Sequence, residues 1–297
     1  MAVKVDCVLD AKAKLGEGAV WDEREGALYW VDIDGRSLRR FDPATGEDRG
    51  WDMPSRIGCF ALREAGGFVV ALEDGFHLFD PAAPEAERFS HLYDPEPDRP
   101  ENRFNDGTTD PRGRFLAGTM PMGPREPVAA LYRLNPDLQV DMLVTGLTVT
   151  NGCAFSPDGS VFYFSDSEPS IRTIWACDHD LDTGALTNRR VFLDTHGLPG
   201  RPDGGTVDAD GCYWMAGVGG WQLVRITPTG EVDMTIDLPV EKPTKPAFGG
   251  AKLDTLYVTS IGAGPMPGTE ARQPQAGGIF ALSVPGVRGL PAPRFAG

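Results

Sequence analysis

The feature of this sequence that most constrains its fold is a repeat of about 40 to 50 residues. In most units an Asp/Gly turn precedes a short run of β-branched and aromatic residues. Asp offers a side-chain hydrogen bond to the turn backbone, and Gly supplies the positive φ that a tight hairpin needs. The runs are too short for helices and are therefore predicted to be strands. They are residues 27–33, 68–72, 114–120, 161–167, 212–218 and 256–261.

The turn glycines give the period of the repeat. They are Gly26, Gly67, Gly113, Gly159 and Gly211, at intervals of 41 to 52 residues. Periods of this size with about four short strands per unit are typical of β-propeller blades. Six units fit the 297 residues, and residues 3–10 would add a strand that completes the last blade. We therefore predict an all-β protein, a six-bladed β-propeller with four-stranded antiparallel blades, as one domain over residues 1–297. A β-sandwich or a two-domain β protein is the alternative.

Composition excludes several classes of function. The chain has 43 Asp and Glu against 28 Lys and Arg, a net charge of −15, whereas nucleic-acid binding requires clustered Lys and Arg. It has no run of about 18 apolar residues that could span a membrane, and residues 1–18 do not read as a signal peptide. Five widely spaced cysteines favour free thiols in a reducing compartment. We expect a cytoplasmic protein that binds neither nucleic acid nor membrane.

Oxygen-bearing side chains stand directly before Gly at equivalent places in four repeats. They are Glu17, Asp106, Asn151 and Asp203. Equivalent positions of successive blades converge on the axis of a propeller, where these groups would repel each other unless a cation lay among them. Carboxylate and amide oxygens suit a hard divalent ion such as Ca²⁺, Mg²⁺ or Mn²⁺. Asp-Gly and Asn-Gly are also ordinary turn dipeptides, but their repetition, together with Glu17, favours a metal site. The equivalent residues of the second and sixth repeats are Ile57 and Lys245.

Five motifs spread over the chain carry a family resemblance. They are LGEGAVWD (15–22), NRFNDGTTDPRGRFLAGTM (102–120), TNGCAFSPDG (150–159), RPDGGTVDADGCYWMA (201–216) and FGGAKLDTLYVTS (248–260). In these motifs the chain resembles the SMP-30/gluconolactonase/regucalcin-like family of six-bladed propeller lactonases. The resemblance implies one divalent metal held by Glu17, Asn151 and Asp203. It also implies that Arg103 and Asn105 contact the substrate.

Two further positions are possible site residues. Asp106 keeps the Asn-Asp-Gly context of the family, and its contact with the metal is left open. Regucalcin-like members carry a substrate-facing Glu just after the AGTM-like stretch, where this chain has Pro121-Met122-Gly123. Met122 therefore marks a departure at which a contact to a substrate hydroxyl is missing.

The predicted activity is the opening of a five- or six-carbon sugar lactone to its aldonic acid. A divalent ion would polarise the lactone carbonyl and stabilise the developing charge, and Asp203 is the candidate base for the attacking water. Arg103 would fix the substrate or the new carboxylate, and Asn105 would bind hydroxyls. The donor types leave Ca, Mg, Mn, Zn and Fe open as the metal. A related propeller esterase acting on phosphotriesters or non-sugar lactones, and a calcium- or ligand-binding propeller without turnover, are the alternatives.

Overall fold

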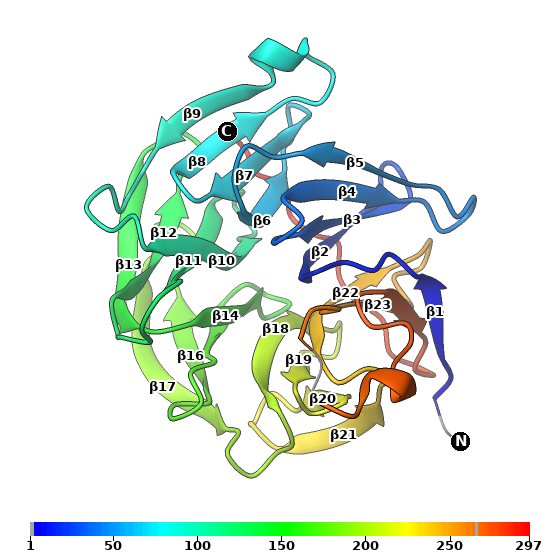
Figure 1. Ribbon diagram of the computed structural model, residues 1–297. Coiled ribbons are helices and arrows are strands. Elements are labelled where there is room, and N and C mark those ends of the chain that lie inside the picture. The colour runs from blue at the N-terminus through cyan, green and yellow to red at the C-terminus, as the bar shows by residue number, and fades with distance from the viewer. Residues whose placement is uncertain (1–2, 265–266) are drawn as a thin grey trace.

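The computed structural model describes residues 3–264 and 267–297, whose strands form six four-stranded sheets around a central axis (Figure 1). Neighbouring strands within each sheet are antiparallel. From the axis outward, the first blade is β2 (Gly16–Asp22), β3 (Ala27–Asp32), β4 (Ser37–Phe41) and β5 (Asp48–Asp52), and the second is β6 (Ile57–Leu62), β7 (Phe68–Leu72), β8 (Gly75–Phe79) and β9 (Phe89–Tyr93). The third blade is β10 (Asn102–Thr109), β11 (Phe115–Pro121), β12 (Ala129–Leu134) and β13 (Val140–Leu147), and the fourth is β14 (Thr150–Phe155), β15 (Val161–Asp166), β16 (Thr173–His179) and β17 (Leu186–Asp194). The fifth blade is β18 (Arg201–Val207), β19 (Tyr213–Val218), β20 (Gln222–Ile226) and β21 (Val232–Asp237), and the sixth is β22 (Pro243–Gly249), β23 (Thr255–Ser260), β24 (Ile279–Leu282) and β1 (Val5–Leu9).

The predicted six-bladed, all-β architecture is confirmed. The six runs recognised in the sequence are the second strands of the blades, from β3 to β23. The predicted N-terminal strand is β1, which pairs with β24 so that Val5 lies opposite Leu282 and Leu9 opposite Ile279. The ring is therefore closed by hydrogen bonds between strands from the two ends of the chain. Two single-turn 3₁₀ helices, η1 (Glu85–Glu87) and η2 (Glu270–Arg272), lie in loops.

The hydrophobic core lies between the blades. The alternation of side chains along each strand gives every sheet two apolar faces, and each face packs on the next blade. In the described part of the chain this produces six clusters, one between each neighbouring pair of blades. Between the last two blades, for example, the ring of Trp214 packs edge-on against Phe248, with ring centroids 6.1 Å apart. The packing holds the inner strands rigidly side by side.

The inner strands β2, β6, β10, β14, β18 and β22 all begin at one end of the axis, called here the top of the ring, and end at its base. A cavity of about 460 Å³ lies on the axis toward the base and is lined by all six inner strands. The C-terminal segment Leu290–Pro293 closes its outer side. Beyond it the fully buried Phe295 donates its backbone N–H to the carbonyl of Leu62 at 2.8 Å, fixing the segment to the base.

The structure also bears on the cysteine thiols and on possible membrane-spanning helices. All five cysteines are free, and four of them are buried. Among the described residues, no helix has the length and apolar character needed to cross a membrane.

Candidate active site

All six inner strands change register close to their starts. The irregularities lie between Glu17 and Val20, Ile57 and Cys59, Phe104 and Gly107, Asn151 and Ala154, Pro202 and Gly205, and Pro243 and Pro246. A bulge re-aims the side chains at its position. The residue-glycine pairs recognised in the sequence thus lie in strand bulges, and not in tight turns. Gly152 has φ +65°, a conformation that strains other residues. A Cβ at Gly204 would lie 2.7 Å from the backbone oxygen of Thr244, so a larger residue there would press against the neighbouring strand β22.

The carboxamide of Asn151 is held by hydrogen bonds on both of its polar atoms. Its Nδ2 donates to Ser167 Oγ at 2.8 Å, and that hydroxyl in turn donates to the carbonyl of Pro202. Its Oδ1 accepts from Asn105 Nδ2 at 2.9 Å. A carbonyl oxygen has two lone pairs, so Oδ1 retains one for a further ligand. Ser167, which no sequence motif indicated, thereby orients a predicted metal ligand.

Asn105 connects the predicted substrate contact to the predicted metal ligand. Its Nδ2 also donates to the carbonyl of Thr150 at 2.9 Å, and its Oδ1 accepts from Arg103 Nη1 at 2.7 Å. Polar groups of two strands on neighbouring blades are thus joined, because Asn105 and Arg103 come from β10 while Asn151 comes from β14. The structure places these three predicted site residues together.

The carboxylates of Glu17 and Asp203 are buried close to each other, at 6% and 7% exposure. Burial raises the pKa of Glu17 well above its usual value, and the neighbouring Asp203 and Asp106 raise it further. Burial likewise raises the pKa of Asp203 to about 7, with Asp106 adding to the effect. Within the described residues, Glu17 accepts one hydrogen bond, from its neighbour Gly18 at 2.9 Å, and Asp203 accepts none. Two buried carboxylates therefore keep almost all of their acceptor sites open.

Asp106 is a third buried acid near these two groups, and its carboxylate is fully used. Both oxygens contact Lys245 Nζ, at 2.8 and 3.0 Å, and they also accept the backbone N–H groups of Gly107 and Cys153. The pair is buried, with Lys245 6% and Asp106 2% exposed. Burial lowers the pKa of Lys245, but Asp106, Cys153 and Glu17 together raise it above its usual value, so the amine is held charged. Asp106 and Lys245 therefore form a buried ion pair across the ring, and the sequence indicated only the equivalence of their positions.

The possible site residue Met122 lies in the loop that follows β11 and is 42% exposed. Its Sδ is 3.9 Å from Arg56 Nη1. The nearby Arg125 donates from Nη1 to the carbonyl of Pro121 at 2.9 Å. Where a Glu was expected from the resemblance, the loop therefore presents a thioether and a guanidinium. Arg125 was not singled out from the sequence.

The groups at the top of the ring fit a divalent cation. Glu17 and Asp203 supply open carboxylate oxygens, and the fixed Asn151 Oδ1 supplies an amide oxygen, which are the donors that hard cations prefer. A cation would also stabilise the charged forms of two acids whose pKa values burial raises. In residues 3–264 and 267–297, no three His, Cys, Asp or Glu side chains are grouped to hold a metal by themselves. Any ion at this place must therefore use the amide as well.

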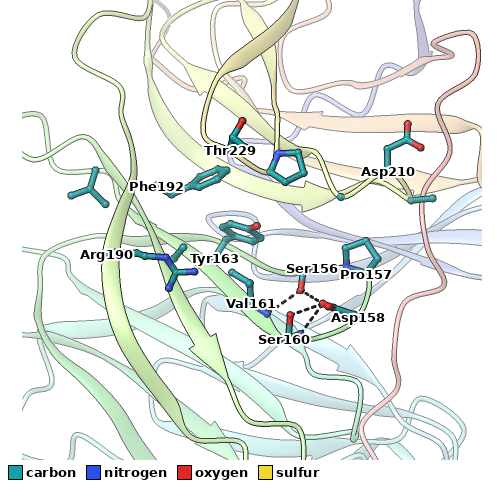
Figure 2. A pocket seen from close by; sticks show the side chains of 15 residues that line it. Ser156, Pro157, Asp158, Ser160, Val161, Tyr163, Arg190, Phe192, Asp210 and Thr229 are labelled. Atoms are coloured by element: carbon teal, nitrogen blue, oxygen red, sulfur yellow. Dashed lines mark hydrogen bonds between the residues drawn. The ribbon is translucent and has the colours of Figure 1, made fainter.

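A larger cavity elsewhere has no part in this arrangement. It measures about 550 Å³ and lies between the fourth and fifth blades, among residues such as Tyr163, Phe192 and Arg190 (Figure 2). Its acid Asp158 accepts hydrogen bonds from the hydroxyls of Ser156 and Ser160, each at 2.7 Å. These bonds lower the pKa of Asp158 to about 2. Asp158, Ser156 and Ser160 thus satisfy one another within a turn, as structural groups do.

The chain belongs to the SMP-30/gluconolactonase/LRE-like family, whose sequence pattern it matches over residues 15–262. It is 38% identical to a regucalcin of Xenopus laevis over 302 residues, covering 100% of this chain and 99% of that protein. It is 39% identical to a 6-deoxy-6-sulfogluconolactonase of Pseudomonas putida over 292 residues, covering 98% of each. The crystal structure of a calcium-binding regucalcin from Agrobacterium tumefaciens superposes with a TM-score of 0.91 at 28% identity, covering 99% of this chain and 98% of that one. The family resemblance inferred from the motifs is confirmed.

Proposed function

We propose that this protein is a metal-dependent lactonase that opens a sugar lactone to the corresponding aldonic acid. The observation that carries the proposal is the grouping of Glu17, Asp203 and Asn151, two open buried carboxylates and one oriented amide, beside Arg103 and Asn105. A relative of similar length is named as a lactonase of a sulfonated gluconolactone. The donor set supports binding of an ion, and the adjoining hydrogen-bonding groups support binding of a sugar.

Glu17, Asn151 and Asp203 would hold the ion, and Ca²⁺, Mg²⁺, Mn²⁺, Zn²⁺ and Fe²⁺ are all compatible with this set. When bound, such an ion polarises a carbonyl oxygen and stabilises negative charge on it. The calcium-binding regucalcin of Agrobacterium tumefaciens makes calcium the first ion to test.

Asp203 is the proposed general base. Its carboxylate is free of protein hydrogen bonds in the described residues, so it can accept a proton from the water that attacks the lactone carbonyl. General base catalysis is typically worth about 10²–10⁴-fold in rate. Asn105 keeps a lone pair on Oδ1 for a sugar hydroxyl, and Arg103 offers N–H groups to substrate oxygens.

Two alternatives have an observation in their favour. The exposed Met122 gives the substrate side a less polar group, which suits an esterase of related type that acts on phosphotriesters or non-sugar lactones. Open carboxylates would also bind a cation in a protein without turnover, a calcium-binding propeller. Each alternative predicts a different substrate response from that of a sugar lactonase.

Acid release in a pH-stat separates the three functions. D-glucono-1,5-lactone, a non-sugar lactone and a phosphotriester are each added to the protein, and the spontaneous rate without protein is subtracted. Chelation followed by gel filtration should abolish sugar-lactone hydrolysis, and adding back single divalent ions should restore it.

Three results would contradict the proposal. Full activity in protein shown by elemental analysis to be metal-free would remove the metal from the reaction. Activity on the phosphotriester or the non-sugar lactone alone would indicate the esterase. Tight calcium binding by calorimetry without acid release from any substrate would indicate the binding protein.

A further inference from the structure

Two arginines are buried among the described residues, and they differ in what neutralises them. Arg114 is 6% exposed and contacts the carboxylate of Asp110 through Nε. Arg103 is 9% exposed, yet no carboxylate of the described residues lies within ion-pair distance of it. Burying a charge without a partner costs several kcal/mol. The position of Arg103 therefore calls for an anion that does not belong to the protein.

The hydrogen bonds of Arg103 leave most of its donors unused. Nη1 donates to the carbonyl of Phe104 at 2.8 Å and to Asn105 Oδ1 at 2.7 Å. Nε and Nη2 have no partner among the described residues, and neither is one of the fully enclosed polar atoms that lack a partner. A guanidinium carries five N–H donors in a planar fork. One edge of this fork is thus held by the protein while the rest remains available to a ligand.

The nearest acids do not neutralise Arg103. Burial lowers the pKa of Arg103 to about 10, and although Asp34 and Glu17 raise it, Arg56 and Arg125 lower it further. Asp34 is already bonded to Arg56 Nε at 2.8 Å. Arg56 also reaches Glu73 through Nη1 at 2.8 Å, so it is neutralised by two acids. Asp34 is therefore already engaged by another arginine, and Arg103 has no ion-pair partner of its own among the described residues.

Arg125 is the second unpaired cation at this place. Arg103 pairs with Met120 across β10 and β11, and the preceding Asn102 pairs with Pro121. Arg125 donates to the carbonyl of that Pro121 at 2.9 Å and, among the described residues, makes no ion pair. Arg125 thus directs a guanidinium to the edge of the strand that bears Arg103. The adjacent Glu126 of the same loop forms no ion pair with it or with any other described residue.

We propose that the lactone substrate carries an anionic substituent, a sulfonate, phosphate or carboxylate, and that Arg103 and Arg125 bind it. The substituent would lie on the part of the sugar remote from the ring carbonyl, so that the carbonyl faces the ion-binding group. This inference rests on the proposed lactonase function. It adds to that function a charge requirement on the substrate and a specificity role for Arg125.

The test compares neutral and anionic lactones in the same acid-release assay. The neutral substrate is D-glucono-1,5-lactone, and the anionic substrates are its 6-phosphate, its 6-deoxy-6-sulfonate and a lactone of the corresponding dicarboxylic acid. The intact protein should show a kcat/KM at least tenfold higher for one anionic lactone than for the neutral one. Comparison of kcat/KM among the three anionic lactones identifies which oxyanion the two arginines bind.

Arg125→Gln should lower kcat/KM for the preferred anionic lactone by about tenfold, the loss expected of one hydrogen bond between charged groups. It should change kcat/KM for the neutral lactone by less than twofold. Arg49→Gln is the matched control, because Arg49 is an exposed arginine on the outer strand β5 that stacks on Trp51. Arg49→Gln removes the same positive charge from an outer strand and should leave the preference for the anionic lactone unchanged.

The outcomes separate this inference from the function on which it rests. Hydrolysis of the neutral lactone with equal or lower rates on all three anionic lactones would overturn the inference and leave the lactonase function intact. The same loss on neutral and anionic lactones in Arg125→Gln would overturn it too. Without turnover of any lactone the proposed function fails. Calorimetric titration with the ring-opened 6-sulfonate and with gluconate then tests the anion site. The inference requires the protein to bind the sulfonate more tightly than gluconate, and Arg125→Gln to abolish that difference.

Discussion

The two ends of the inner strands use the same residue types in opposite ways. At the base, the fully buried Asp208 accepts the backbone N–H groups of Asp210 and Cys212, the indole of Trp214 and the guanidinium of Arg225. At the top of the ring, on the same blade, Asp203 is buried and accepts no hydrogen bond from the described residues. Both acids belong to the recurring Asp/Gly pattern. The difference teaches that completeness of bonding, and not residue type, separates an acid that stabilises the fold from one that is available to a ligand.

The other blades show the same contrast. Asp110 at the base accepts the N–H groups of Arg112 and Arg114 and contacts the guanidinium of Arg114. Asp22 is paired with Arg294 of the C-terminal segment. Glu17, at the top of the strand that ends in Asp22, has a single hydrogen bond from the adjacent backbone.

Replacing the open acid should produce the largest effect on activity. Asp203→Asn removes the proposed base and one charged ligand of the proposed metal ion, so kcat should fall by about 10²–10⁴-fold. Because the carboxylate makes no stabilising bond with the protein, the free energy of unfolding of the metal-free protein should stay the same or rise. Initial rates in the pH-stat and urea unfolding measure the two quantities. Turnover near that of the intact protein would assign the base to another group.

Breaking the buried ion pair of Asp106 and Lys245 should produce the largest effect on stability. Lys245→Met leaves the carboxylate of Asp106 buried without its cation, which typically costs about 3–5 kcal/mol of unfolding free energy. The double variant Lys245→Met/Asp106→Asn should recover part of this loss, because both charges are then gone. A double-mutant cycle from urea unfolding measures the coupling. Additive losses would show that the two side chains do not stabilise each other.

Replacing the saturated acid at the base should give the reverse of the Asp203 result. Asp208→Asn places an amide N–H₂ among groups that donate, so the free energy of unfolding should fall by about 1–3 kcal/mol. The kcat of the folded variant should stay within twofold of the intact protein. The same unfolding and rate measurements apply. A large loss of kcat at full stability would contradict the division between the two ends.

The smallest expected effect is on how the free energy of unfolding changes at acidic pH. Burial raises the pKa of Asp110, but the neighbouring His179, with Nε2 3.5 Å away, and the hydrogen bonds and charge of Arg114 together lower it below its usual value of 3.8. A lowered pKa adds stability above the pKa of the unfolded chain, and this contribution is lost as the pH falls through the folded pKa. Urea midpoints of Asp110→Asn and the intact protein should therefore differ at pH 6 and converge below pH 4. A constant difference across this range would show that the charge of Asp110 adds no stability.

The repeat made the ring of blades and the strand that closes it predictable, because the spacing of short strands and turns is a local property of the sequence. The grouping of Glu17, Asn151 and Asp203 followed from their equivalence within the repeat. The partnership of Asp106 with Lys245 could not be predicted, because it joins positions 139 residues apart across the axis. It depends on side-chain length and on which of six converging positions face each other. The strand bulges could not be predicted either, because Asp-Gly and Asn-Gly pairs are equally typical of turns.

The pairing of β1 with β24 also has a consequence for synthesis of the protein. The strand that completes the last blade is translated roughly 270 residues before its partner Ile279–Leu282. At a ribosomal rate of about 5–20 residues per second, β1 waits on the order of tens of seconds for that partner. During this time the nascent chain exposes both an unpaired strand and an open first blade. The ring therefore cannot close until the strands of the last blade have been synthesised.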